Sequence, residues 1–162
     1  MGRWRPPQKQ GAPYITEQGY VRLEEEQKSL WATRRDVVKH LAAAAAEGDR
    51  SENAEYIYRK KQLRELDRRI GYLERRMPKL QIVRERANTD QVFFGAYVNL
   101  IDEDGKEFRY RIVGSDEIDH AEEHISVDAP VAKALLGKRR DDEVQVKLAE
   151  RSIIFVVEKI DY

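Results

Sequence analysis

Two long amphipathic segments of the chain meet at Gly48-Asp49-Arg50-Ser51-Glu52-Asn53-Ala54-Glu55-Tyr56, and this stretch decides the fold. Glycine commonly ends a helix, because it tolerates the left-handed backbone that follows the last turn. The polar residues after Gly48 suit a short connection. We therefore predict a helical hairpin with the carboxylates of Asp49 and Glu52 at its tip.

The segment before this turn has the spacing of a coiled-coil seam. Thr16 suits the N-cap of a helix, with Ile15 and Tyr20 as a hydrophobic staple around it. Inward positions then alternate at intervals of three and four, at Tyr20, Leu23, Gln27, Leu30, Arg34, Val37, Leu41 and Ala44. This pattern predicts a helix that begins near Thr16 and ends before Gly48.

The segment after the turn repeats the rhythm. Its inward positions are Tyr56, Leu63, Leu66, Ile70, Leu73, Met77 and Leu80, with Arg59 as the one polar position. Pro78 is expected to weaken or kink the last turn. Two helices of similar length joined by a short turn must run antiparallel.

A strand-like period replaces the helical one in the second half of the chain. Strands are predicted over 92–101, 107–113, 124–127, 144–148 and 152–160, with a hairpin turn at Asp102–Gly105 and one short helix over 130–136. The fold class is α+β, a coiled-coil hairpin followed by a small antiparallel sheet domain. We expect a flexible tail at 1–13, the hairpin at 14–82, a linker at 83–91 and the sheet domain at 92–162.

The composition is ordinary for a protein of a reducing cytoplasm. The chain has no cysteine, which excludes a disulfide framework and thiolate metal sites. No apolar run is long enough to span a bilayer, and the start of the chain lacks the apolar stretch of a secretory signal, so we expect a cytoplasmic protein. The net charge of +0 hides a division into +6 for residues 1–82 and −6 for residues 83–162, and the basic half favours polyanions.

The acidic tip has two interpretations. In the first, Asp49 is the N-cap of the second helix and Glu52, three residues later, completes a capping box. In the second, the two carboxylates are oxygen ligands for Mg²⁺, which usually takes only one or two carboxylates from a protein. Two ligands on a turn cannot hold Mg²⁺ tightly, so a partner would have to complete that site.

The second helix is unusually basic. Residues 59–79 contain nine Lys and Arg against Glu65, Asp67 and Glu74. At about 100° per residue, the face opposite the seam carries Lys60, Lys61, Arg64, Arg68, Arg75 and Lys79. This face is either a solvated helix surface or a track for a phosphate backbone, which would hold nucleic acid without reading its sequence.

Three further motifs are best explained by local structure. His120-Ala-Glu-Glu-His124 matches a zinc peptidase pattern, but the segment leads into a strand, which favours an acidic loop. Asp102-Glu-Asp-Gly105 begins like a calcium loop but lacks the later ligands, which favours a turn. In Ser126–Lys138, Asp128 is expected to cap a short helix, with Pro130 in its first turn and Gly137 at its end.

Taken together, these residues resemble the Gre transcript-cleavage factors of bacteria, and more closely their GreB branch. The resemblance covers residues 14–162. Its most specific parts are Gly48–Tyr56, the basic Tyr58–Arg69, Val92-Phe-Phe-Gly-Ala96, Tyr110-Arg-Ile-Val-Gly114 and Ile125-Ser-Val-Asp-Ala-Pro130. The Pro-rich start before Tyr14 is longer than is usual in this family.

The resemblance implies a factor that docks on RNA polymerase through an FKBP-like C-terminal domain, with Asp128 and Pro130 in the polymerase-contacting segment. Its coiled coil would enter the secondary channel and place Asp49 and Glu52 beside the catalytic aspartates of the polymerase. There the two acids would help to hold a Mg²⁺ and a nucleophilic water, so that the polymerase hydrolyses backtracked RNA. The basic face would contact the 3′ segment of the nascent RNA, and binds DNA at most non-specifically.

Three alternatives have the same sequence features. A channel-binding inhibitor of the polymerase would share the fold but lack productive tip geometry. A stand-alone prolyl isomerase would use the C-terminal fold, although no isomerase pocket is marked in the sequence. A plain RNA-binding coiled coil would bind RNA tightly without a polymerase. A transcript-cleavage assay separates the first from a cleavage factor.

Overall fold

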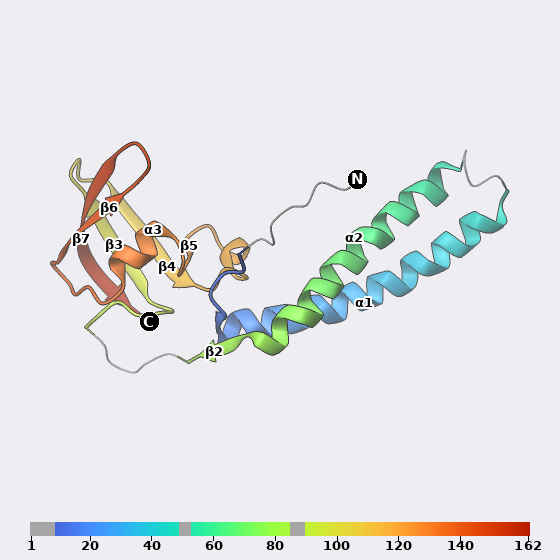
Figure 1. The fold of residues 1–162 in the computed structure, drawn as a ribbon, viewed down its shortest axis with the longest axis horizontal. Helices are drawn as coiled ribbons and strands as arrows, with labels where there is room; N and C mark the ends of the chain where they lie inside the picture. The colour runs from blue at the N-terminus through green and yellow to red at the C-terminus, as the bar shows by residue number, and fades with distance from the viewer. Residues whose placement is uncertain (1–8, 49–52, 85–89) are drawn as a thin grey trace. The chain divides into compact units, whose positions relative to one another are not determined.

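The fold was taken from a computed structural model, which describes residues 9–48, 53–84 and 90–162 (Figure 1). The chain divides into two compact units. The helical unit spans Tyr20–Leu80, and the sheet unit combines Met1–Gly19 with Gln81–Tyr162. Within the described residues, no helix is both long enough and apolar enough to cross a membrane.

The helical unit is the antiparallel hairpin that the sequence predicts. Helix α1 spans Glu17–Ala46 and helix α2 spans Ala54–Arg76, and the two lie side by side (Figure 1). The predicted inward positions are confirmed: each is buried or half-buried. The buried ones are Leu23, Val37, Ala44, Ile70, Leu73 and Met77. Burial of this apolar stripe is the main source of hairpin stability, because an isolated helix is marginal in water.

Polar residues also cross the hairpin seam. Arg34, a predicted seam position, places its Nε 2.6 Å from Oδ1 of Asp67 on the opposite helix. The Arg69 guanidinium donates two hydrogen bonds, of 2.6 and 3.0 Å, to the Glu26 carboxylate. Such cross-helix pairs contribute modestly to stability, but they set the register of one helix against the other.

The helix ends follow local chemistry. Thr16 is the N-cap of α1, as predicted, because its hydroxyl oxygen accepts a hydrogen bond of 3.0 Å from the Gly19 N–H. At the other end of the hairpin stem, Pro78 lies in the 3₁₀ helix η1 (Met77–Lys79), which follows α2. The expectation that this proline weakens the last turn is confirmed, because proline lacks the N–H that α-helix would require.

The sheet unit contains a five-stranded sheet in the order β5-β4-β3-β7-β6. Its strands are β3 (Tyr97–Asp102), β4 (Glu107–Val113), β5 (His124–Ser126), β6 (Glu143–Lys147) and β7 (Ser152–Asp161), and the short helix α3 spans Pro130–Leu135. The predicted α+β class is confirmed. The sheet is mixed rather than wholly antiparallel, because β5 runs parallel to β4 after the connection through the 3₁₀ helix η2 (Ile118–His120).

One strand begins later than the period of the sequence suggests. A strand is predicted from Val92, but β3 starts at Tyr97. Gly95 has a φ of +90°, which breaks an extended run, and its N–H donates to the Ile112 carbonyl. Val92 is nevertheless fully buried, because it packs in the hydrophobic core with Ala132 and Leu135 of α3. The alternating pattern around Val92 therefore indicates that this side chain is buried, but it does not indicate a strand.

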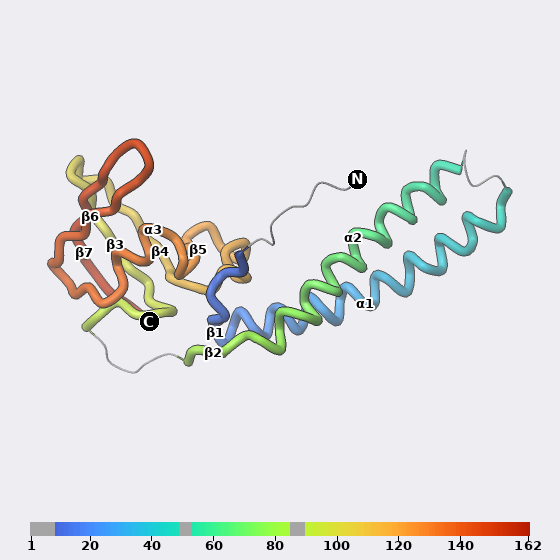
Figure 2. Tube along the Cα trace, in the orientation of Figure 1, coloured from blue at the N-terminus to red at the C-terminus, as the bar shows by residue number. Residues whose placement is uncertain are grey.

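Two short strands were not predicted. Strand β1 (Tyr14–Thr16) pairs in parallel with β2 (Gln81–Val83), two segments far apart in the sequence that lie side by side (Figure 2). The carbonyl oxygen of Pro13 accepts a hydrogen bond of 2.7 Å from the Gln81 N–H, which extends this pairing. Ordered contacts therefore begin before residue 14, inside the segment expected to be a tail. Residues 1–8 of that tail and 85–89 of the expected linker lie outside the described residues.

Candidate functional site

Asn53 makes hydrogen bonds to both helices beside the hairpin tip. Asp49 and Glu52 lie outside the described residues. On the α2 side, the Asn53 side-chain oxygen accepts a hydrogen bond of 3.1 Å from the Tyr56 N–H, and Asn53 is the N-cap of this helix. Its side-chain amide donates 2.8 Å to the carbonyl of Ala44 in α1. The stem that carries the tip acids is thus fastened across both helices.

The capping interpretation of the tip acids is wrong. It required α2 to begin directly after Asp49, whereas the helix begins at Ala54 with Asn53 as its cap. The third helical position is then Tyr56, which has no carboxylate to complete a capping box. Capping therefore gives no account of the acids at positions 49 and 52, and their role as metal ligands stays a prediction.

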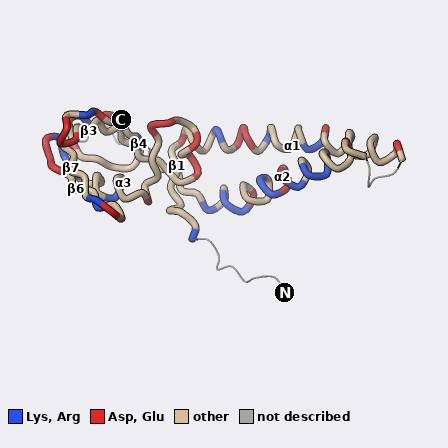
Figure 3. The backbone as a smooth tube through the Cα atoms, turned by 90° about the horizontal axis from the view of Figure 1, so that it is seen from above, with Lys and Arg blue, Asp and Glu red and all other residues tan. Residues whose placement is uncertain are grey.

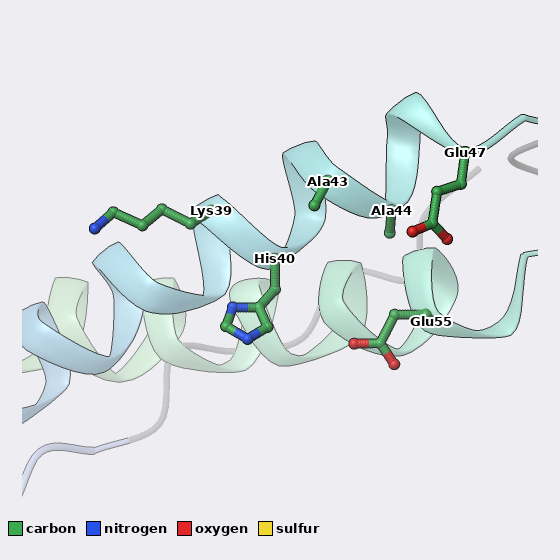
Figure 4. Close-up of a pocket in the computed structure, with 6 residues that line it drawn as sticks. All are labelled: Lys39, His40, Ala43, Ala44, Glu47 and Glu55. Carbon is green, nitrogen blue, oxygen red and sulfur yellow. The ribbon is translucent and has the colours of Figure 1, made fainter.

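A hollow lies on the hairpin close to this end (Figure 4). Its lining residues are Lys39, His40, Ala43, Ala44, Glu47 and Glu55. Ala44 and Glu47 point toward α2 in Figure 4, and Lys39 extends away from the other side chains. Glu55 is engaged by Arg59 at 2.7 Å, and the His40 ring lies 2.8 Å from the Asp36 carbonyl. The alanine run leaves this space open, a consequence that sequence reasoning missed.

The predicted basic face is exposed along α2. This holds for Lys60, Lys61, Arg64, Arg68 and Arg75. By contrast, Arg59 and Arg69, on the seam side, are half-buried and form ion pairs with Glu55 and Glu26. Figure 3 shows how densely basic positions follow one another along α2.

In the part of the chain that the structure describes, most cations of this basic face form no ion pair. Within the described residues, Lys61, Arg64, Arg68 and Arg75 take part in no ion pair, and Lys60 lies over the Tyr56 ring at 5.9 Å. A helix surface that only serves solubility mixes both signs and pairs them. The row of unpaired cations therefore favours an anionic ligand such as a phosphate backbone.

Asp128 and Pro130 are both exposed on the sheet unit. Pro130 opens α3 as predicted, and Gly137 follows the helix with a φ of +81°. The predicted cap is wrong, because the N-cap of α3 is Ala129 and no side chain caps it. The Asp128 carboxylate instead accepts a hydrogen bond of 2.7 Å from the Ala12 N–H. Sequence reasoning could not find this contact, since the two residues are 116 positions apart.

A second hollow lies on the sheet unit and was also missed. Its floor is apolar and aromatic, with Phe108, Tyr110, Val131, Val146, Ile153 and Phe155 among the lining residues. Its rim is charged and includes Asp102, Asp104, Lys106 and Arg151. An apolar floor with a polar rim is the usual composition of a protein-binding surface. Val131 links it to the Asp128–Pro130 segment along the chain.

The zinc peptidase pattern does not form a metal site. His120 ends η2 and His124 begins β5, so the two histidines do not share a helix. Within the described residues, no three potential ligands among His, Cys, Asp and Glu gather as a metal site. The calcium-like sequence is a turn, as predicted: Asp102 Oδ1 accepts from the N–H groups of Asp104 and Lys106, at 2.9 and 2.8 Å.

Glu117 is a buried carboxylate that no sequence motif singled out. Its oxygens accept hydrogen bonds from the Thr16 N–H at 3.0 Å, from the Gly114 N–H at 2.9 Å and from the Thr16 hydroxyl. Its side chain also lies directly over Gly19, where a Cβ would overlap it. Because a buried charge is tolerated only when it is well hydrogen-bonded, this network fixes β1 and the first turn of α1 within the sheet unit.

Comparison with known proteins gives consistent matches over both units. A family model described as transcription elongation factor, GreA/GreB, C-term matches residues 87–162, and one described as transcription elongation factor, N-terminal matches residues 13–82. The chain is 54% identical to the transcription elongation factor GreB of Xanthomonas axonopodis pv. citri, over 100% of this chain and 98% of that protein.

Two further matches have lower identity. Identity to the GreB of Pseudomonas aeruginosa is 49% over 100% of this chain and 98% of that protein. Among solved structures, GreA factor homolog 1 (Gfh1) of Thermus thermophilus aligns over 92% of this chain and 98% of its own, at 23% identity and a TM-score of 0.42.

Proposed function

The chain belongs to the GreA/GreB family of transcription elongation factors, and we propose that it stimulates the intrinsic RNA cleavage of RNA polymerase. In this proposal the factor is not itself an enzyme. It enters the secondary channel of the polymerase in the cytoplasm and rescues arrested, backtracked complexes. Full-length relatives named transcription elongation factor GreB support this function over the alternative of a channel-binding inhibitor.

The observation that carries the proposal is that Asn53, and not one of the two tip acids, caps the second helix. Asn53 caps α2 and donates a hydrogen bond to the Ala44 carbonyl, so neither tip acid is needed as the cap of this helix. The sequence nevertheless places acids at positions 49 and 52, on either side of Arg50 and Ser51. Acids at the end of a long hairpin, beside a helix that another residue caps, suit a role in a partner's active site.

The cofactor in this proposal is Mg²⁺ shared with the polymerase. Asp49 and Glu52 offer hard oxygen ligands, which fit this ion, but two carboxylates are too few for tight binding by the isolated factor. The two carboxylates would help to hold this ion, which would supply an activated water for attack on a phosphodiester. The contribution of this chain is to deliver the two carboxylates on a stem of fixed geometry.

The basic face is the proposed contact for RNA. Lys60, Lys61, Arg64, Arg68 and Arg75 form an exposed row on α2, the helix that begins just after the tip. RNA that is extruded during backtracking is single-stranded, and its phosphates would follow this row. The contact would be independent of base sequence, because lysine and arginine contacts to phosphate carry no base information.

Docking is proposed for the sheet unit. Asp128 and Pro130 are exposed at the start of α3, and the apolar hollow lined by Val131 and Phe155 adjoins them through that helix. An exposed acid beside an apolar hollow offers both orientation and buried area to a protein partner. RNA polymerase is the proposed occupant.

A cleavage assay on stalled, backtracked complexes tests the function. The factor is added to purified complexes with labelled RNA, and release of 3′ fragments is followed with time. We expect the wild-type chain to accelerate cleavage, and Asp49→Asn to lose that effect while still competing with wild type for the polymerase. A wild-type chain that binds the complex but leaves its cleavage rate unchanged, or lowers it, would identify the inhibitor instead.

A further inference from the structure

A backbone segment ahead of β1 packs against the turn that holds Asp128. The Ala12 N–H donates a hydrogen bond of 2.7 Å to Oδ2 of Asp128. Beside it, Gly11 lies against Ser115: a Cβ at position 11 would overlap the Ser115 hydroxyl and lie 3.1 Å from Asp128 Oδ2. Glycine is therefore favoured at position 11 by the close approach of the Ser115 side chain.

Each of the two segments in this contact makes a further hydrogen bond next to it. On the N-terminal side, the Pro13 carbonyl accepts 2.7 Å from the Gln81 N–H. On the other side, the Asp128 N–H donates 3.1 Å to the Ser126 hydroxyl. The hydrogen bond from the Ala12 N–H to the Asp128 carboxylate thus joins two segments that are each anchored by a neighbouring contact.

The consequence concerns the orientation of the carboxylate. An exposed aspartate samples several rotamers, and a partner that binds it must fix one of them at an entropic cost. Here the Ala12 N–H holds Oδ2, and a hydrogen bond to an ionised carboxylate belongs to the stronger class. Oδ1 makes no hydrogen bond within the described part of the chain, and the side chain stays exposed.

We propose that Gly11 and Ala12 form a positioning element of the docking surface. They hold the Asp128 carboxylate in one orientation, so that Oδ1 accepts a hydrogen bond from a cationic or amide donor of RNA polymerase. The inference rests on the proposed function, in which Asp128 docks on the polymerase. The positioning element acts through Asp128 and is not itself a contact to the polymerase.

Removal of one donor tests the inference. Ala12→Pro deletes the N–H without adding a charge, and Ala12→Ser keeps it as the matched control. The dissociation constant of each full-length variant for RNA polymerase is measured by fluorescence anisotropy, with thermal melting to confirm the fold. We expect Ala12→Pro to weaken binding by about tenfold, the scale of one hydrogen bond to a charged group, and Ala12→Ser to bind like wild type.

A double-mutant cycle separates positioning from direct contact. If the segment acts through Asp128, then Ala12→Pro has no further effect in an Asp128→Ala background. Additive losses would mean that the segment contacts the polymerase independently, which overturns the positioning role. Tighter binding by Ala12→Pro would mean that the segment competes with the polymerase for the carboxylate, which overturns it as well.

A compensating pair avoids dependence on proline. Gly11→Ala should weaken binding because its Cβ overlaps Ser115, and adding Ser115→Gly should restore binding by removing the Ser115 side chain. Failure of the inference and failure of docking give different results. If Asp128→Ala weakens binding while Ala12→Pro and Gly11→Ala do not, the positioning role is wrong. If Asp128→Ala also binds like wild type, Asp128 is not a docking residue and both proposals fall.

Discussion

The side-chain amide of Asn53 donates a hydrogen bond of 2.8 Å to the carbonyl oxygen of Ala44, across the open end of the hairpin. The oxygen of the same side chain accepts from the Tyr56 N–H. Asn53 therefore satisfies one of the last carbonyls of α1 and one of the first N–H groups of α2, which helix ends otherwise leave unpaired. Because Asn53 and not an acid makes these contacts, helix capping and the role of the acids can be tested with separate variants.

Replacing the tip acids should abolish stimulation without unfolding the hairpin. For Asp49→Asn and Glu52→Gln we expect cleavage of backtracked RNA to fall about 100-fold, the scale of losing one active-site electrostatic contact. The melting temperature should stay at the wild-type value, since Asn53 and not Asp49 caps α2. Fragment release and circular dichroism melting are the two measurements.

Asn53→Ala is the reciprocal variant. Loss of the cap should lower the free energy of unfolding by about 1 kcal/mol, as for other N-cap replacements. The acids remain, so cleavage should survive at temperatures well below the melting point.

Near-normal cleavage by Asp49→Asn and Glu52→Gln would disprove the metal-ligand role of the tip.

The basic face should matter most for long extruded RNA. Lys61→Ala with Arg64→Ala removes two exposed, unpaired cations from α2. We expect slower cleavage of RNA that has backtracked by many nucleotides, little change for RNA that has backtracked by two or three, and weaker salt dependence, by about 0.7 in log–log slope for each lost phosphate contact. Cleavage rates are compared across salt concentrations for both RNA lengths.

A charge-matched control lies on the other helix. Lys28→Ala with Arg35→Ala removes two exposed cations from α1. This pair should leave both cleavage rates close to wild type. An equal loss for short and long RNA in the α2 variant, or the same loss in the α1 control, would mean that net charge and not the α2 face is responsible.

Docking should depend on the start of α3. Asp128→Ala and Pro130→Ala should each weaken polymerase binding, the first by about tenfold, with the fold intact because both side chains are exposed. Competition against labelled wild-type factor measures the change. Glu122→Ala removes an exposed acid elsewhere on the sheet unit and should have no effect. Unchanged affinity for both test variants would remove this segment from the interface.

Two helical glycines should respond in opposite ways to alanine. Glycine inside a helix normally costs about 1 kcal/mol relative to alanine, so Gly71→Ala should be neutral or stabilising, with only the flexible end of Arg75 near its new Cβ. Gly19→Ala should destabilise the protein, because its Cβ would overlap the buried side chain of Glu117. Urea denaturation of both variants measures the difference, and stabilisation by Gly19→Ala would contradict the packing described here.

The helical hairpin could be predicted almost completely from the sequence. The alternation of three and four in Leu23, Val37 and Ala44 reports one face of a helix, and the structure buries that face. Thr16 and Pro78 act through neighbours within a few residues, so their roles could also be predicted. The exposure of Lys61 and Arg64 follows from the same periodicity, because a helix turns by a constant angle.

The residues that the sequence misassigned have partners far along the chain. Asp128 was expected to cap the helix next to it, but Ala12, 116 positions away, takes its carboxylate. Glu117 carries no motif, and only the fold brings Thr16 and Gly19 to it. Val92 alternates like a strand but lies in a loop, where its N–H donates to the Lys138 carbonyl and its carbonyl accepts from the Gly137 N–H.

Local periodicity and capping were therefore determined by the sequence itself, because they depend on bonds and angles within a few residues. Tertiary structure alone decided which polar groups pair across the chain, since a carboxylate hydrogen-bonds to whichever donor the fold brings within about 3 Å. Asn53 shows both levels in one residue. Its cap on Tyr56 is local, and its hydrogen bond to Ala44 exists only once the two helices have packed.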